Sequence, residues 1–141
     1  MNFEPRAAVS RVIVFFETLS PAGVSQLGEL YAADARFKDP FKQVQGVPQV
    51  QAIFQHMFEA LEQPRFVITG QVVQARECFM TWEFRFGFKS FRKGEQQVIL
   101  GASHLVFNDA GQVTLHRDYW DAAEELYEKL PVVGGLMRWL K

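Results

Sequence analysis

The sequence has a single cysteine, Cys78, and only three histidines in 141 residues. One cysteine cannot form an internal disulfide, and its apolar neighbour Phe79 indicates burial, so a reducing, cytoplasmic location is expected. The cysteine and the histidines occur at no recognised ligand spacing, so no metal site is predicted. Gly134 and Gly135 lack the strand–turn–helix context of a phosphate loop, and we expect no cofactor.

An excess of charge of either sign is also missing. The 15 basic and 16 acidic residues give a net charge of −1, and the basic residues are scattered. Such a chain has no long-range field to attract nucleic acid, so nucleic acid is not an expected partner. No apolar run approaches the roughly 18 residues that span a bilayer. Because Glu4, Arg6 and Arg11 interrupt the apolar N-terminal stretch, neither a secretory signal nor a transmembrane segment is expected.

Apolar residues are plentiful, at 48% hydrophobic and 14% aromatic, which is enough for the core of one domain. In the first half of the chain they recur at helical spacing. Helices are therefore predicted over about residues 5–19, from Ser20 to about Tyr31, and over about residues 47–61. Residues 35–41 are predicted to be extended, since Pro40 disfavours helical angles at the preceding residue.

The second half changes to a period of two, most clearly at Trp82, Phe84, Phe86 and Phe88. Turn signals separate strands that are predicted near residues 65–75, 78–90, 96–108 and 112–120. Three helices followed by four consecutive strands predict an α+β domain, with helices packed on one face of a mainly antiparallel sheet.

The segment after Trp120 is too apolar for a free tail in solvent. A helix is predicted over residues 121–130, and the whole chain, 1–141, is expected to be one domain with a core at about 5–121 and a helical extension at about 122–141. Packing of this extension on the sheet or at the rim of a pocket is the favoured prediction. The alternative is a lid or docking segment that contacts a membrane surface peripherally through Arg138 and Lys141.

Two segments carry a family resemblance. The first, Tyr31-Ala-Ala-Asp-Ala-Arg-Phe-Lys-Asp-Pro-Phe41, is similar to a stretch of the ketosteroid isomerases and the SnoaL-like polyketide cyclases. The second, Ser103-His-Leu-Val-Phe-Asn-Asp-Ala-Gly-Gln-Val113, resembles the hairpin that carries the oxyanion-hole acid of the isomerases. The resemblance extends to about Trp120 and implies the cone-shaped, nuclear-transport-factor-2-like fold with a pocket for a small apolar ligand. It also implies a homodimer.

The resemblance places candidate residues one by one. Asp39 falls where the isomerases keep their catalytic carboxylate base. Phe15 falls where they keep a tyrosine donor, and Ser103 where they keep a protonated aspartic acid. Losing one such donor typically costs about 2.7–4 kcal/mol of transition-state stabilisation. Because both strong donors are replaced, steroid isomerase activity is not expected.

Polar residues alternate on the last predicted strand, where His116, Asp118 and Trp120 share one face. The resemblance points this face toward the pocket, where the isomerases carry apolar groups, and SnoaL-like cyclases are similar in using a histidine and an acid there. Polar groups facing an apolar cavity are costly unless they are paired or used. We therefore predict Asp39 as base, His116 as acid/base and Asp118 as the group that orients the imidazole; a purely structural hydrogen bond of His116 is the alternative.

The predicted pocket is lined by Ser103 and by six aromatic side chains, Phe15, Phe54, Trp82, Phe84, Phe86 and Trp120. The favoured function is an isomerase-like or cyclase-like enzyme that transfers a proton next to a carbonyl of a small apolar molecule. The loss of both strong donors keeps a non-catalytic ligand-binding or accessory protein as an alternative. A dimeric scaffold is a third hypothesis for the function, and it is favoured if the pocket has no room for a ligand.

Overall fold

The computed structural model describes residues 3–89, 93–121 and 124–125. Helices and strands follow one another as α1 (Pro5–Glu17), a 3-10 helix η1 (Ala22–Gln26), α2 (Leu27–Leu30), β1 (Tyr31–Lys38), β2 (Gln43–Gln45), α3 (Val47–Ala60), β3 (Leu61–Gln74), β4 (Glu77–Phe88), β5 (Gln97–Phe107) and β6 (Val113–Tyr119). The predictions for residues 122–141 lie outside the described residues, apart from Glu124 and Glu125.

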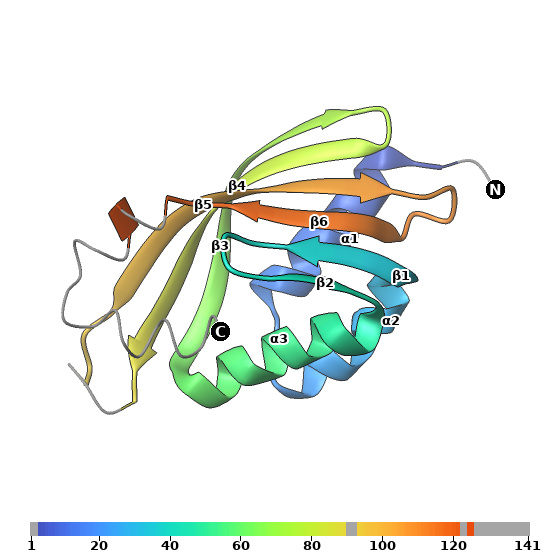
Figure 1. Cartoon of the computed structure of the whole chain (residues 1–141). Coiled ribbons are helices and arrows are strands. Elements are labelled where there is room, and N and C mark those ends of the chain that lie inside the picture. Colours follow the sequence, from blue (N-terminus) through green and yellow to red (C-terminus); the bar gives the residue numbers. More distant parts are fainter. Residues whose placement is uncertain (1–2, 90–92, 122–123, 126–141) are drawn as a thin grey trace.

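The strands form one curved sheet in the order β2-β1-β6-β5-β4-β3, with the helices on its concave side (Figure 1). All neighbours pair antiparallel except β1 and β6, which run parallel. α1 lies against β3, and α3 lies against β1 and β3. The predicted α+β class with a helix-covered, mainly antiparallel sheet is confirmed.

The core forms where the helices meet the aromatic strand β4. α1 buries Ala8, Val9, Val12 and Phe16 along one stripe, and α3 buries Val50, Phe54 and Met57. From β4, every second residue from Cys78 to Phe88 is buried. Helix starts follow local rules, since Pro5 and Pro48 occupy first-turn positions and Gly46 adopts φ 100° before α3.

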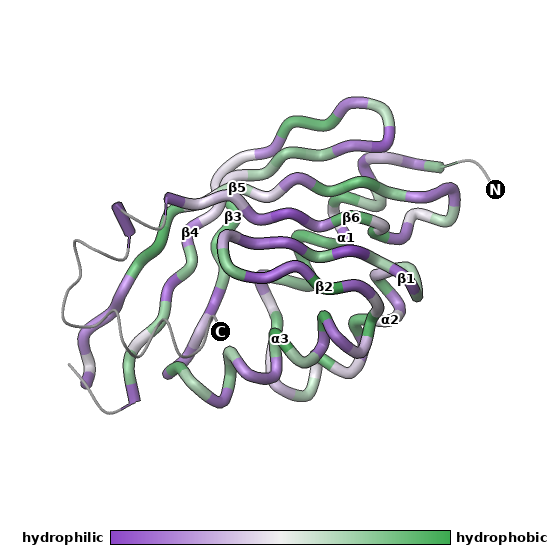
Figure 2. The backbone as a smooth tube through the Cα atoms, viewed as in Figure 1, coloured by the Kyte–Doolittle hydropathy of each residue, from purple (hydrophilic) through white to green (hydrophobic). Residues whose placement is uncertain are grey.

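Two elements differ from the sequence prediction. The second helix is not continuous, because a 3-10 turn leads into the four residues of α2 and Tyr31 already belongs to β1. β1 was expected only from about residue 35, and β2 was not expected. β1 buries residues without strict alternation and shifts register between Tyr31 and Arg36, so it lacks a period-two signal. β2 has only three residues and is mostly hydrophilic (Figure 2).

Within the part of the chain that the structure describes, no helix is both long enough and apolar enough to cross a membrane.

Candidate active site

Two neighbouring strands, β5 and β6, bring polar side chains together on the concave face of the sheet. Ser103 on β5 lies opposite Asp118 on β6, and Leu105 lies opposite His116. Directly opposed residues of an antiparallel pair point to the same face with their Cβ atoms close together. Pairing of β5 with β6 therefore sets Ser103, His116 and Asp118 side by side.

A continuous chain of hydrogen bonds, here called the polar network, links these groups to two aromatic residues. The indole Nε1–H of Trp82 donates to Ser103 Oγ at 2.8 Å, and Ser103 Oγ donates to Asp118 Oδ1 at 2.5 Å. His116 Nε2 lies 2.6 Å from the same carboxylate oxygen. On the other side of the imidazole, the Tyr31 hydroxyl lies 2.5 Å from Nδ1. The network joins β1, β4, β5 and β6 inside the domain.

Described residues hold the carboxylate of Asp118 through one of its two oxygens. Both neighbours, Ser103 and His116, meet Oδ1, and no described residue forms a hydrogen bond with Oδ2. The side chain of Asp118 is 18% exposed, whereas that of His116 is 6% exposed. Among the described residues, Oδ2 is therefore the oxygen of this carboxylate that has no hydrogen-bond partner and is open to a ligand.

Two small cavities and one open cleft meet at Asp118. The first cavity, about 20 Å³, lies beneath Phe16, Trp82, Ser103 and His116. The second, about 40 Å³, lies beside Asp39, Phe84 and Trp120. A water molecule needs roughly 10–15 Å³, so each cavity has room for one or a few waters. The cleft, about 630 Å³, runs along the ends of β1 and β6, and Asp118 is among the lining residues of all three spaces.

Asp39 follows β1 and lines two of these spaces together with Asp118. Its Oδ1 accepts the backbone N–H groups of Phe41 and Lys42, both at 2.8 Å, which is a turn held by a side chain. The residue is 9% exposed. Burial raises the pKa of Asp39, the two backbone amides oppose this shift, and the nearby Asp118 adds to it. The two carboxyl groups share the 40 Å³ cavity and the cleft.

Sequence comparison identifies the family of the chain. The SnoaL-like domain family matches residues 12–116, a range that includes every member of the polar network except Asp118. The chain belongs to the SnoaL-like domain family. No relative was found among curated proteins.

Solved structures of several SnoaL-like and related proteins share the fold of the chain. A protein from Jannaschia sp. described as a SnoaL-like polyketide cyclase superposes with a TM-score of 0.72 at 16% identity, covering 88% of this chain and 93% of that one. An LEH-like epoxide hydrolase from M. tuberculosis gives 0.73 at 16%, covering 98% and 95%. A steroid delta-isomerase from Pseudomonas aeruginosa gives 0.67 at 19%, covering 96% and 87%. At these identities the likeness establishes the fold alone.

The predicted pocket residues are distributed over several spaces in this SnoaL-like domain. Phe54, Trp82 and Ser103 line the 20 Å³ cavity, and Phe84 and Trp120 line the 40 Å³ cavity. Phe15 is half-buried and is not among the residues that line either cavity. Its neighbour Phe16 lies there instead, because the buried stripe of α1 continues from Val12 to Phe16, one helical turn later.

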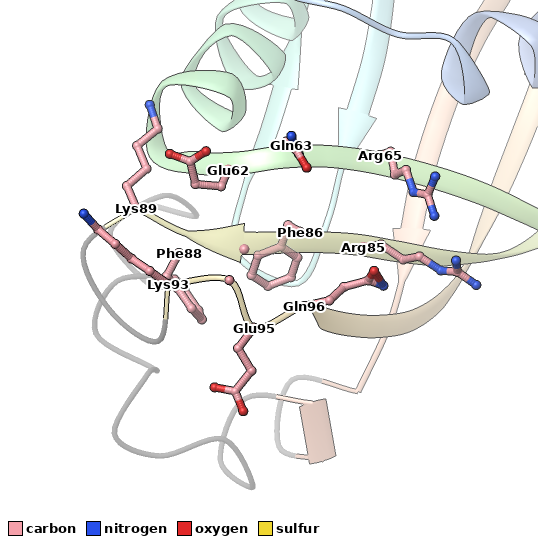
Figure 3. A pocket seen from close by; sticks show the side chains of 12 residues that line it. Glu62, Gln63, Arg65, Arg85, Phe86, Phe88, Lys89, Lys93, Glu95 and Gln96 are labelled. Carbon is pink, nitrogen blue, oxygen red and sulfur yellow. The ribbon is translucent and has the colours of Figure 1, made fainter.

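Phe86 lies beyond the inner cavities, at an open groove of about 720 Å³ near the start of β3 and the end of β4 (Figure 3). The groove is lined largely by charged side chains, among them Arg65, Arg85, Lys89 and Glu95. Arg85 is paired with Glu83 at 2.7 Å. Because no member of the polar network lines this groove, we place the candidate site at Asp118 and not here.

Sequence reasoning missed two residues of the site. The sequence predicts Tyr31 as the end of a helix and the start of a motif, whereas the structure buries it fully, where its hydroxyl needs a partner. Gly101 lies opposite Trp82, and a Cβ there would overlap with the indole ring. Glycine at position 101 therefore makes room for the indole that binds Ser103.

The convex face of the sheet carries a separate set of side chains. His104 points away from Ser103, stacks on Phe79 with 4.3 Å between ring centroids, and places Nε2 2.8 Å from Glu77. Arg117 lies over the ring of Tyr119 at 4.6 Å. The large exposed apolar residues on this face are Val72, Phe79, Leu100 and Tyr119. In the described ranges, no group of three or more His, Cys, Asp or Glu is arranged to hold a metal ion.

Proposed function

We propose that this SnoaL-like protein is a proton-transfer enzyme, isomerase-like or cyclase-like, that acts next to a carbonyl of a small apolar molecule. The observation that carries the proposal is the environment of Asp118. Its carboxylate has one oxygen tied to Ser103 and His116, a second oxygen without a partner among the described residues, and apolar rings around it. A base in such a position is oriented and partly desolvated, which suits proton abstraction from carbon.

The geometry supports roles that differ from those expected from the sequence. Both ring nitrogens of His116 already have partners, so we assign the orienting role to His116 and the role of base to Asp118. Asp39, whose pKa is raised by burial, is the candidate proton donor. Two carboxyl groups whose environments differ in this way form an acid/base pair.

In the proposed catalytic cycle the protein takes up one proton and releases one. Asp118 Oδ2 takes a proton from the carbon beside the carbonyl, and protonated Asp39 donates a proton to the resulting enolate at another position. Transfer of one proton from Asp118 back to Asp39 through water then restores the starting state.

Access to Asp118 comes from the open cleft, because the two inner cavities hold no more than a few water molecules. Trp120 lines both the cleft and the 40 Å³ cavity and packs on Phe41 with 5.7 Å between ring centroids. A ligand would bind first in the cleft, and a larger apolar group would enter by displacing Trp120.

Two further structures with this fold support a small organic ligand. A ketosteroid isomerase-like protein from Catenulispora acidiphila, 17% identical with a TM-score of 0.69, is in complex with trimethylamine. TerC, 14% identical with a TM-score of 0.70, was co-crystallized with polyporic acid. We extend only the general feature, a small-molecule site inside this fold, to the present chain.

Hydrogen–deuterium exchange tests the proposal without knowledge of the natural substrate. The protein is incubated in D2O with a panel of small apolar ketones, and deuterium gained at the carbon beside the carbonyl is measured by NMR. Asp118→Asn is expected to lower the exchange rate by about 10²–10⁴-fold, the usual contribution of a general base. Asp34→Asn, on an exposed residue of β1, is the matched control and should leave the rate unchanged. Equal rates for Asp118→Asn and the unaltered protein would refute the role of Asp118.

A non-catalytic ligand-binding protein is the second candidate function. It is favoured by the turn around Asp39, where two backbone amides bind the carboxylate that the isomerases use as base. Ketones that bind, as seen by ligand-observed NMR, without any exchange catalysed by the protein would support this alternative.

We also propose that the chain forms a homodimer through the convex face of its sheet. Val72, Phe79, Leu100 and Tyr119 are each at least 45% exposed there, which is an unusual concentration of large apolar groups for a face in water. A second copy with the same patch would cover it symmetrically. A dimer that serves only as a scaffold would retain this contact and show no ligand binding at Asp118.

A further inference from the structure

Tyr31 is the innermost member of the polar network. It begins β1, is 0% exposed, and its hydroxyl reaches across the parallel β1–β6 pair to Nδ1 of His116. Burial raises the pKa of Tyr31 well above its usual value, and the charge of Asp118 raises it further. The phenol therefore keeps its proton and enters the network as a donor.

The partner of the Tyr31 hydroxyl determines which ring nitrogen of His116 carries the proton. His116 Nδ1 is the partner that the described residues offer to the Tyr31 hydroxyl, so the phenol proton is directed at Nδ1. Nδ1 must then be an acceptor. The ring proton lies on Nε2, where Oδ1 of Asp118 accepts it at 2.6 Å.

A charged imidazole would break this assignment. With protons on both ring nitrogens, Tyr31 would have to accept from Nδ1, and its own buried proton would lose its partner. Phe16 and Phe37 pack against the imidazole, with ring centroids 5.7 and 4.9 Å away, and their side chains offer no acceptor.

We propose that Tyr31 is a positioning residue that fixes His116 in the neutral Nε2–H tautomer. The imidazole then donates its one N–H to Oδ1 of Asp118, the oxygen that also accepts from Ser103, and His116 itself is not the base. This inference rests on the proposed role of Asp118, and it names a residue that acts through His116 to leave Oδ2 as the oxygen for the chemistry.

Nitrogen-15 NMR of histidine-labelled protein tests the proposal at neutral pH. The chain has three histidines, and His116→Gln identifies the resonances of His116 by their loss. In the unaltered protein we expect Nε2 to give a protonated, pyrrole-type signal and Nδ1 an unprotonated, pyridine-type signal. Tyr31→Phe should remove this single pattern, giving tautomer-averaged shifts for His116.

Tyr119→Phe is the matched control, because it removes the same hydroxyl from an exposed residue of β6 on the convex face. It should leave the His116 signals unchanged. If Tyr31 has only a packing role, Tyr31→Phe would lower the unfolding temperature but keep the His116 tautomer, and the proposal would be wrong. An Nδ1–H tautomer or an imidazolium in the unaltered protein would also overturn it.

A second measurement covers the case in which Tyr31→Phe does not fold. Incorporating 3-fluorotyrosine keeps the shape of the ring but makes the phenol a stronger donor, so the Nδ1 signal of His116 should shift while the signals of His56 and His104 do not. A fluorinated protein with an unshifted Nδ1 signal would contradict the proposal. None of these measurements needs a substrate, so their failure is separate from failure of the deuterium-exchange test.

Discussion

Replacing Gly101 by alanine tests whether close contact with Trp82 builds the site. Gly101 lies opposite Trp82 in the β4–β5 pair, and an added Cβ would overlap with three carbons of the indole six-membered ring. The indole must then move, and the hydrogen bond from its Nε1–H to Ser103 Oγ, which is 2.8 Å long in the unaltered protein, is lost. The buried Trp82, 6% exposed, has no other polar partner in the described network.

The size of the effect follows from two costs. Overfilling a packed core costs about 1–3 kcal/mol, and a buried donor without a partner costs about 1–3 kcal/mol. Since the same displacement causes both, we expect Gly101→Ala to lower the free energy of unfolding by about 2–6 kcal/mol. For a domain of this length each kcal/mol corresponds to roughly 3–4 °C, so Tm should fall by about 6–24 °C.

Thermal unfolding followed by circular dichroism measures this shift. Gly28→Ala is the control: Gly28 lies in α2, and its added Cβ would meet Val47 at an ordinary 3.6 Å. It should leave Tm unchanged or raise it slightly, since alanine favours a helix over glycine. The double variant Trp82→Phe with Gly101→Ala should be less destabilised than the sum of the single changes. A Gly101→Ala protein as stable as the unaltered one would refute the reasoning.

Two remaining predictions concern pH and association. Because the pKa of Asp39 is raised in the folded state, the native protein binds more protons than the unfolded one above the ordinary aspartate pKa, so stability should fall as pH rises from there through the folded pKa. Asp39→Asn should flatten this part of the urea-unfolding profile, and an unchanged slope would contradict the raised pKa. Phe79→Glu should convert a dimer to a monomer in light scattering, whereas Val14→Glu, at another exposed apolar position on α1, should not. A dimer that survives Phe79→Glu would exclude the convex face as the interface.

The sequence predicted the long elements because their periodicity is strong. The aromatic alternation of β4 and the apolar stripes of α1 and α3 each follow from one period that spans several turns or residue pairs. The sequence does not predict β2 and gives α2 the wrong bounds, because three or four residues are too few to show a period. The parallel partnership of β1 with β6 depends on contacts far apart in sequence, and no local pattern encodes it.

For the site, the sequence indicated which face of β6 is polar but not how its groups are bonded. Period two places His116 and Asp118 on one face, and both do lie there. Their roles depend on which atoms meet, and the partner of Nδ1 comes from a strand formed 85 residues earlier. The catalytic roles of Asp39, His116 and Asp118 stay predictions.

The bond between Tyr31 and His116 also has a consequence for how the protein folds. It joins residues 85 positions apart, across the parallel pair that links the first long strand to the last. Formation of contacts with such a large sequence separation closes a long loop and lowers the entropy of the chain, which tends to slow folding. During synthesis on a ribosome, β1 can pair with β6 only after β6 has been synthesised. The polar network is thus completed only when the whole sheet has assembled, and chains arrested before β6 should have an unpaired edge on β1 and no candidate site.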